Sequence, residues 1–154
     1  MSTEDITKVD QIKLVVEAIK RTGNIIDWGD GLRLEFHAED VPLQIGRADL
    51  MLIDKANGTL YIVEIIPGEV IAEDVGRLLS YYGWLRKNLL PDLTPTEDLL
   101  GLGSWFRPAE SELFRDVKGI LLTESFGAAA LCALAACPAV IGRTYEFSIE
   151  VSKS

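Results

Sequence analysis

Apolar residues recur with helical spacing in two parts of the chain. The first part predicts a helix over about residues 10–21 that ends before Gly23, with an inward stripe of Ile12, Val15, Val16 and Ile19. The second part predicts a longer helix over about residues 72–88, with a broad apolar face of Val75, Leu78, Leu79, Tyr82 and Leu85. Each helix therefore has one face to bury against a core.

Between these helices the period changes to two, which is typical of β-strands. A half-exposed strand is predicted where apolar residues alternate with charged residues and histidine, at Leu32, Leu34, Phe36 and Ala38. Two more strands are predicted over about residues 48–54 and 59–66. The linking residues, Lys55-Ala56-Asn57-Gly58, favour a tight hairpin.

The second half of the chain is less regular. Prolines and glycines indicate an irregular excursion over about residues 90–114. A strand is then predicted at about 118–123, a small buried helix at 128–136 and an alternating strand at 145–151. With 154 residues, 48% of them hydrophobic, the pattern predicts a single domain over residues 1–154. Its fold class is α/β, a sandwich in which helices flank a mixed central β-sheet.

Composition narrows the classes of function. A net charge of −9 disfavours a generic coat on nucleic acid, although local basic patches are compatible with it. The single histidine, His37, excludes multi-histidine metal sites, and Cys132 and Cys137 are too few for a structural zinc site. We interpret both cysteines as small buried thiols of a reducing compartment. The acidic amino terminus is unlike a signal peptide and the longest apolar run is short for a membrane span, so we expect a cytoplasmic protein without a membrane partner.

Two carboxylates occupy apolar positions of the predicted hairpin. If its loop has four residues, Asp49 lies opposite Glu64; if the loop is only Asn57-Gly58, the two are diagonal neighbours. In either register they share one face of the sheet, with Cβ atoms roughly 5–8 Å apart. Like charges in half-buried strands repel and lose hydration, so folding alone gives no reason for the pair. A divalent cation such as Mg²⁺ would explain the pair, because such ions are held by one or two carboxylates together with water. The alternative is an exposed edge position for Glu64, or an ion pair of Asp49 with Arg47 or Arg33.

Several segments in order resemble the PD-(D/E)XK, or restriction-endonuclease-like, nuclease superfamily, and most closely the nuclease domain of the NucS/EndoMS mismatch endonucleases. The matching segments are Gly31-Leu32-Arg33, Gly46-Arg47-Ala48-Asp49-Leu50, Tyr61-Ile62-Val63-Glu64-Ile65, Asp74-Val75-Gly76-Arg77-Leu78-Leu79-Ser80-Tyr81-Tyr82-Gly83-Trp84 and Val117-Lys118-Gly119-Ile120-Leu121-Leu122.

The resemblance implies a set of site residues. Asp49 and Glu64 correspond to the catalytic acids that hold Mg²⁺ or Mn²⁺ in the superfamily. Glu17 matches, more weakly, an acid that some members supply from the first helix. Arg47 and Tyr81 are placed beside the site or the substrate.

Two departures from the superfamily pattern bear on catalysis. Ile66 stands where the family has a lysine, and it shares a strand face with Glu64 but cannot orient water or stabilise charge. Arg77 stands where the family's helix usually carries a glutamine. Its guanidinium is either a migrated catalytic cation, since it stabilises phosphoryl charge, or a surface charge one turn from Glu73 or Asp74.

The leading interpretation is a nuclease-fold protein, related to DNA-processing endonucleases, whose hydrolysis is lost or impaired while divalent-metal or nucleic-acid binding persists. One alternative is an active Mg²⁺- or Mn²⁺-dependent DNA endonuclease that uses Arg77. A second alternative is a non-enzymatic adaptor domain. The partners expected are DNA or a DNA-processing protein, with a homodimer as a further option.

Overall fold

The computed structural model describes residues 7–22, 26–29, 31–89 and 114–146. The elements follow the predicted order of helix, three strands, helix, strand, helix and strand. Their bounds are α1 Lys8–Thr22, β1 Glu35–Leu43, β2 Gly46–Asp54, β3 Thr59–Val70, α2 Ala72–Leu89, β4 Asp116–Phe126, α3 Ala128–Ala135 and β5 Val140–Thr144. The predicted excursion over 90–114 falls outside the described residues except for Phe114, which is buried.

The strands form one mixed sheet in the order β1-β2-β3-β4-β5. Strands β1, β2 and β3 are antiparallel neighbours joined by short turns, whereas β3, β4 and β5 are parallel. Parallel neighbours need long crossover connections. Helix α2 lies in the crossover between β3 and β4, and α3 lies in the one between β4 and β5. The predicted α/β fold with a mixed central sheet is confirmed.

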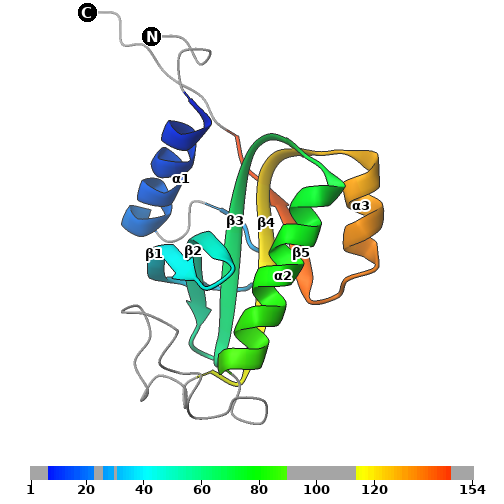
Figure 1. Cartoon of the computed structure of the whole chain (residues 1–154). Helices are drawn as coiled ribbons and strands as arrows, with labels where there is room; N and C mark the ends of the chain where they lie inside the picture. Colours follow the sequence, from blue (N-terminus) through cyan, green and yellow to red (C-terminus); the bar gives the residue numbers. More distant parts are fainter. Residues whose placement is uncertain (1–6, 23–25, 30, 90–113, 147–154) are drawn as a thin grey trace, which may run out of the picture.

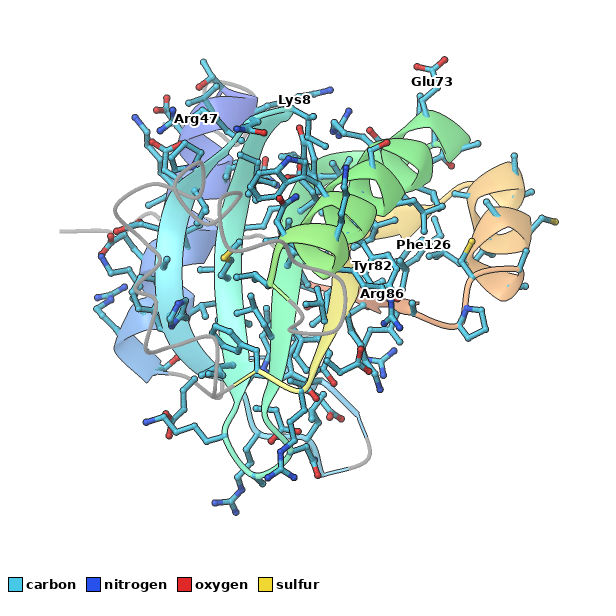
Figure 2. All side chains as sticks on the ribbon, turned by 60° about the horizontal axis from the view of Figure 1, so that its bottom comes forward. Lys8, Arg47, Glu73, Tyr82, Arg86 and Phe126 are labelled. Carbon is cyan, nitrogen blue, oxygen red and sulfur yellow. The ribbon has the colours of Figure 1, made fainter. Side chains whose placement is uncertain are left out.

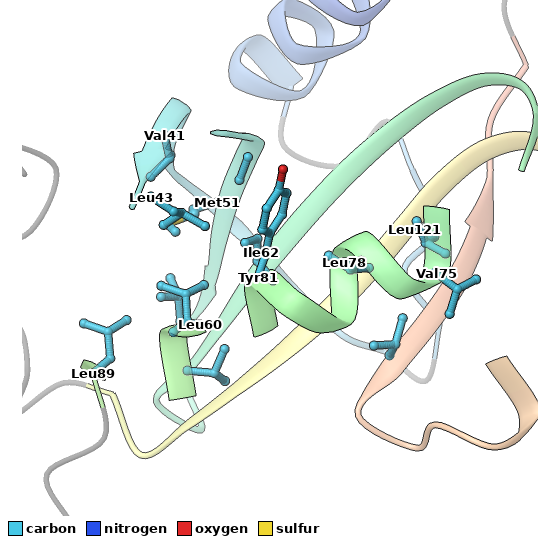
Figure 3. Packing of buried hydrophobic residues seen from close by; sticks show 14 of the residues in the cluster. Val41, Leu43, Met51, Leu60, Ile62, Val75, Leu78, Tyr81, Leu89 and Leu121 are labelled. Carbon is cyan, nitrogen blue, oxygen red and sulfur yellow. The ribbon is translucent and has the colours of Figure 1, made fainter. Parts of the chain in front are cut away.

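Helices cover both faces of the sheet, and a separate apolar cluster fills the space on each side (Figure 1). On one face, Val15, Val16 and Ile19 of α1 pack against residues that include Leu50, Val63 and Ile65. On the other face, the inward stripe of α2 packs against Met51, Ile62 and Leu121 (Figure 3). β3 contributes to both clusters because successive side chains of a strand point to opposite faces.

The prediction for the first strand was wrong in position and in the face of its side chains. Leu32 and Leu34 precede β1 and pack on the cluster below α1, while Phe36 is 37% exposed. The register between β1 and β2 shifts between Phe36 and Ala38. Such a bulge moves the following side chains to the other face of the sheet. After the bulge Ala38 packs on the cluster below α2, and beyond Asp40, whose φ is 48°, Val41 and Leu43 are buried in that same cluster.

The small helix predicted near the carboxyl end is present, but it is mostly exposed and not buried as predicted. Helix α3 buries only Ala130 fully, and Leu131 is 53% exposed. Cys132 is exposed and Cys137 is partly exposed, so neither is a buried thiol. The reason is the place of α3: it lies at the edge of the molecule beside α2 and β5 (Figure 1), where a short helix has one covered side.

The final strand also lies earlier than predicted. β5 ends at Thr144, and Tyr145 and Glu146 are not in a strand, while residues 147–151 lie outside the described residues. The hydroxyl of Tyr145 instead accepts a hydrogen bond from Gln11 of α1. None of the described helices has the length and apolar character needed to cross a membrane.

Candidate functional site

The predicted carboxylate pair lies where β2 and β3 separate. Asp54 pairs with Thr59 and Leu50 with Val63, so the hairpin has the four-residue loop and the first of the two predicted registers. The backbone ladder ends at Leu50–Val63, one pair before Asp49 and Glu64 would meet. Side chains bridge the strands beyond that point: Oδ2 of Asp49 accepts a hydrogen bond of 2.8 Å from the backbone N–H of Ile65.

Glu64 is the more deeply buried member of the pair, with 5% of its surface exposed. The backbone N–H of Asp49 opposes the rise in the pKa of the Glu64 carboxyl group. One carboxylate oxygen, Oε1, is buried and has no hydrogen-bond partner among the described residues. An unsatisfied buried carboxylate oxygen is costly for folding, so this position needs another explanation.

Burial raises the pKa of both carboxyl groups. For Glu64, desolvation and then the neighbouring Asp49 charge raise the pKa to about 8. The pKa of Asp49 is also raised by desolvation, and the Ile65 N–H and the Arg77 charge oppose that rise. Burial thus disfavours the ionised form of both acids and keeps Glu64 largely protonated at neutral pH, whereas a bound cation would favour the ionised forms.

Among the described residues, Arg77 of α2 is the cation that forms an ion pair with Glu64. Its Nε lies 3.9 Å from Oε2 of Glu64, and its Nη2 lies 3.0 Å from Oδ1 of Asp74 one turn earlier. The side chain is 43% exposed. Arg77 thus makes both contacts that the two sequence-based interpretations predicted. It pairs with Asp74 on the helix surface, and it reaches Glu64 of the predicted site.

Ile66 and Glu17 supply no charge next to the pair. Ile66 is partly buried and packs against the apolar cluster below α2, so a hydrocarbon side chain follows Glu64 on the same face of β3. Glu17 of α1 lines a groove of about 680 Å³ together with Asp49. Its side chain is 56% exposed and its ion pair, at 3.5 Å, is with Lys20. In the part of the chain that the structure describes, no three acidic, histidine or cysteine side chains are grouped closely enough to hold a metal ion.

Tyr81 lies against Gly46, the residue before Arg47. Arg47 forms its ion pair with Asp40, and not with Asp49 or Glu64. The Arg47 guanidinium binds Asp40, with Nε 2.8 Å from Oδ1 and Nη2 3.0 Å from Oδ2. This contact lies at the end of the molecule that also carries Lys8 (Figure 2). The alternative prediction, an Asp49–Arg47 ion pair, is therefore wrong. Asp40 itself was missed: it has φ 48°, a conformation in which aspartate is enriched, and only its place after a strand-like segment hinted at a turn.

The two carboxylates fit a divalent cation of the Mg²⁺ type. Such ions bind through one or two carboxylates and retain several waters. Oε1 of Glu64 has no hydrogen-bond partner among the described residues, and a bound cation would stabilise the ionised forms that burial disfavours. A site with two carboxylates binds weakly, because the remaining ligands must come from water and substrate.

Comparison with known proteins establishes the fold. No family model matches the chain, and no curated protein sequence does. Among solved structures, a repair endonuclease from Pyrococcus abyssi is similar with a TM-score of 0.59 and 18% identity, over 94% of this chain and 50% of that one. A complex of EndoMS with double-stranded DNA has a TM-score of 0.58 and 18% identity, over 88% and 44% of the two chains. EndoMS in its apo form has a TM-score of 0.54 and 19% identity, over 96% and 49%.

These likenesses confirm the predicted restriction-endonuclease-like fold and its resemblance, at the level of the fold, to the NucS/EndoMS enzymes. The chain spans about half the length of each of these neighbours. At such low identity the likeness concerns the fold, and it does not carry the neighbours' activity over to this chain.

Proposed function

We propose that this chain is a nuclease-related domain that binds a divalent cation weakly at Asp49 and Glu64, contacts nucleic acid there, and hydrolyses phosphodiesters poorly or not at all. The observation that carries the proposal is the buried pair itself. Two neighbouring carboxylates have raised pKa values, one oxygen has no partner, and an isoleucine stands beside them where a cation is needed.

Each side chain has a distinct part in this proposal. Asp49 and Glu64 hold Mg²⁺ or Mn²⁺, which when bound supplies Lewis acidity for phosphodiester chemistry. Arg77 is exposed enough to contact a phosphate and close enough to Glu64 to share its charge. Ile66 accounts for the impaired hydrolysis, because a hydrocarbon side chain neither orients a water molecule nor stabilises developing charge.

DNA is the proposed nucleic acid. One structural neighbour is a complex with double-stranded DNA. With a net charge of −9, this chain lacks the broad positive surface that gives strong non-specific binding. Contact with DNA is therefore confined to local cations such as Arg47 and Arg77, and it is weak unless a further domain or partner protein holds the DNA.

Arg77 favours one rival function, an active nuclease in which the guanidinium replaces the missing lysine. The 3.9 Å approach to Glu64 makes this chemically reasonable, because a guanidinium stabilises phosphoryl negative charge well. However, Arg77 cannot act as a proton shuttle, because it does not lose its proton near neutral pH.

The metal site is tested by thermal unfolding with increasing Mn²⁺ or Mg²⁺. Ligands that bind the folded state raise the melting temperature by mass action. We expect a rise for the wild type, and none for Asp49→Asn or Glu64→Gln. Glu73→Gln is the matched control, since Glu73 is an exposed acid that projects from α2 (Figure 2). An equal rise in all four proteins would exclude the site.

Hydrolysis is tested with Mn²⁺ on single-stranded, duplex and mismatched DNA. We expect little or no cleavage by the wild type. Cleavage that is robust in the wild type and abolished by both Glu64→Gln and Arg77→Ala would instead establish the rival function.

A further inference from the structure

The backbone of the first four residues of β2 is not paired with β3, although β3 carries Glu64. Pairing between the two strands begins at Leu50–Val63, so the segment from Gly46 to Asp49 lies beyond the ladder. Its last residue is tied to β3 by one side-chain contact, the hydrogen bond from the Ile65 N–H to Asp49. Its first residue, Gly46, pairs with Leu43 of β1 and has no pairing with β3.

Tyr81 of α2 contacts Gly46, the first residue of β2. The side chain is buried, with 7% exposed, and its ring projects from α2 into the space beside β2 (Figure 3). A Cβ atom added at Gly46 would overlap the hydroxyl oxygen and ring carbons of Tyr81. The backbone N–H of Arg47 also acts on the Tyr81 hydroxyl, where it opposes the rise in the Tyr81 pKa that burial causes. Glycine at position 46 is thus what allows the ring to reach the strand.

The same end of this segment is also tied to β1. The Arg47 side chain makes two hydrogen bonds to the carboxylate of Asp40 and one, of 3.2 Å, to its carbonyl oxygen. Both side chains are largely exposed, so this ion pair adds little stability. The buried ring of Tyr81 is the contact from α2 to this end of the hairpin. Helix α2 is in turn anchored by Leu78 and Leu85, which are fully buried.

We propose that the Tyr81–Gly46 contact positions Asp49 against Glu64, so that Tyr81 is a positioning residue that acts through the hairpin. Together with the hydrogen bond from Ile65 to Asp49, it sets the distance between the two carboxylates beyond the end of the ladder. Where the proposal concerns metal affinity, it rests on the proposed function above; where it concerns the spacing of the carboxylates, it stands without a metal.

Two substitutions perturb the contact from its two sides. Tyr81→Phe keeps the ring and removes the hydroxyl that approaches Gly46. Gly46→Ala places a methyl group against the hydroxyl and ring of Tyr81, at a position where φ is also positive. The matched controls are Tyr82→Phe on the same helix, where the hydroxyl contacts Arg86 instead (Figure 2), and Gly31→Ala, where φ is positive but a Cβ has open space.

The first measurement is the Mn²⁺ concentration that gives half of the maximal rise in melting temperature. Loss of a residue that orients metal ligands weakens affinity by about 10-fold or more. We expect at least that increase for Tyr81→Phe and Gly46→Ala, and wild-type values for both controls. In a Tyr81→Leu background, which leaves room for the Cβ, Gly46→Ala should add little further loss.

The second measurement needs no metal. Amide hydrogen exchange at Ile65 reports the place of Asp49 directly, because the Ile65 N–H donates its hydrogen bond to Oδ2 of Asp49. Tyr81→Phe and Gly46→Ala should speed exchange at Ile65 selectively, relative to the paired residues Leu52 and Tyr61 in the middle of the β2–β3 ladder. Both control variants should leave exchange at Ile65 as in the wild type.

The outcomes separate this inference from the proposed function. If the wild type shows no response to Mn²⁺, the proposed function fails, and hydrogen exchange at Ile65 alone decides the positioning role. If both variants merely lower the melting temperature, with wild-type Mn²⁺ response and wild-type exchange at Ile65, the contact is structural and the inference is overturned. If Gly46→Ala fails to fold, the decision rests on Tyr81→Phe, which retains the ring.

Discussion

Glu64 is expected to make the folded chain less stable as the pH rises through neutrality. Its pKa is about 8 in the folded state against an ordinary value of 4.5. Between these values the folded protein binds more protons than the unfolded chain, so stability falls with increasing pH. The contribution is fully present below the unfolded pKa and is lost as the pH rises through about 8. The raised pKa of Asp49 acts in the same direction.

The size of the effect follows from the two pKa values. Over a pH range where the folded state binds one proton and the unfolded chain binds none, the free energy of unfolding falls by about 1.4 kcal/mol per pH unit. Between about pH 5 and about pH 8.5 the loss from Glu64 is about 4 kcal/mol, a large part of the stability of an ordinary domain. Because Glu64 is 5% exposed, solvent screens this cost very little.

Glu64→Gln isolates this contribution, because glutamine resembles the protonated acid and does not titrate. We expect urea unfolding to give the variant about 4 kcal/mol of stability over the wild type at about pH 8.5, relative to their difference at about pH 5. Glu73→Gln, at an exposed position, should show no such change between the two pH values. Equal pH dependence in the wild type and Glu64→Gln would refute the reasoning, and would mean that Glu64 is already compensated in the folded state.

Three further results are expected. Ile66→Lys should fold with a loss of about 1–3 kcal/mol in urea unfolding, because the two acids next to it lower the cost of burying an ammonium group; failure to fold would show that the pair does not face this position. Affinity for random duplex DNA at physiological salt, measured by fluorescence anisotropy, should be weaker than about 1 µM, and tight, steeply salt-dependent binding would reveal a basic surface that the net charge conceals. Leu78→Ala should lower stability by about 2–5 kcal/mol because Leu78 is fully buried, whereas Leu131→Ala, at a 53% exposed position, should change it by less than about 0.5 kcal/mol.

The parts of the fold that were predictable from the sequence depend on local patterns. The faces of α1 and α2 followed from apolar spacing, and Asn57-Gly58 with its flanking residues identified the β2–β3 hairpin. The face shared by Asp49 and Glu64 followed from that hairpin. The bulge near His37 was not predictable, since it arises from pairing with β2 and has no local signal. The exposure of α3 was not predictable either, since alanine is compatible with both buried and exposed helices.

The environment of the site was predictable only in part. Sequence placed Arg77 on α2 and left open whether it serves Asp74 or the site, and the structure shows contact with both. The separation of β2 from β3 beyond Leu50 depends on how α2 and β1 pack, so the hydrogen bond from Ile65 to Asp49 could not be foreseen. The residue identities were thus available from the sequence, but the charges and contacts around them required the tertiary structure.

The two kinds of strand pairing in the sheet have a consequence for the order in which the chain folds. Leu52 and Tyr61, paired between β2 and β3, are nine residues apart, whereas Ile62 and Gly119, paired between β3 and β4, are 57 apart. Closing the longer loop costs more entropy, so the β1–β2–β3 meander should form first and β4 should join it late. Core substitutions in the meander should then mainly slow refolding, and those in β4 should mainly speed unfolding. The carboxylate pair belongs to the part that forms early, so its electrostatic cost is met before the second half of the sheet is in place.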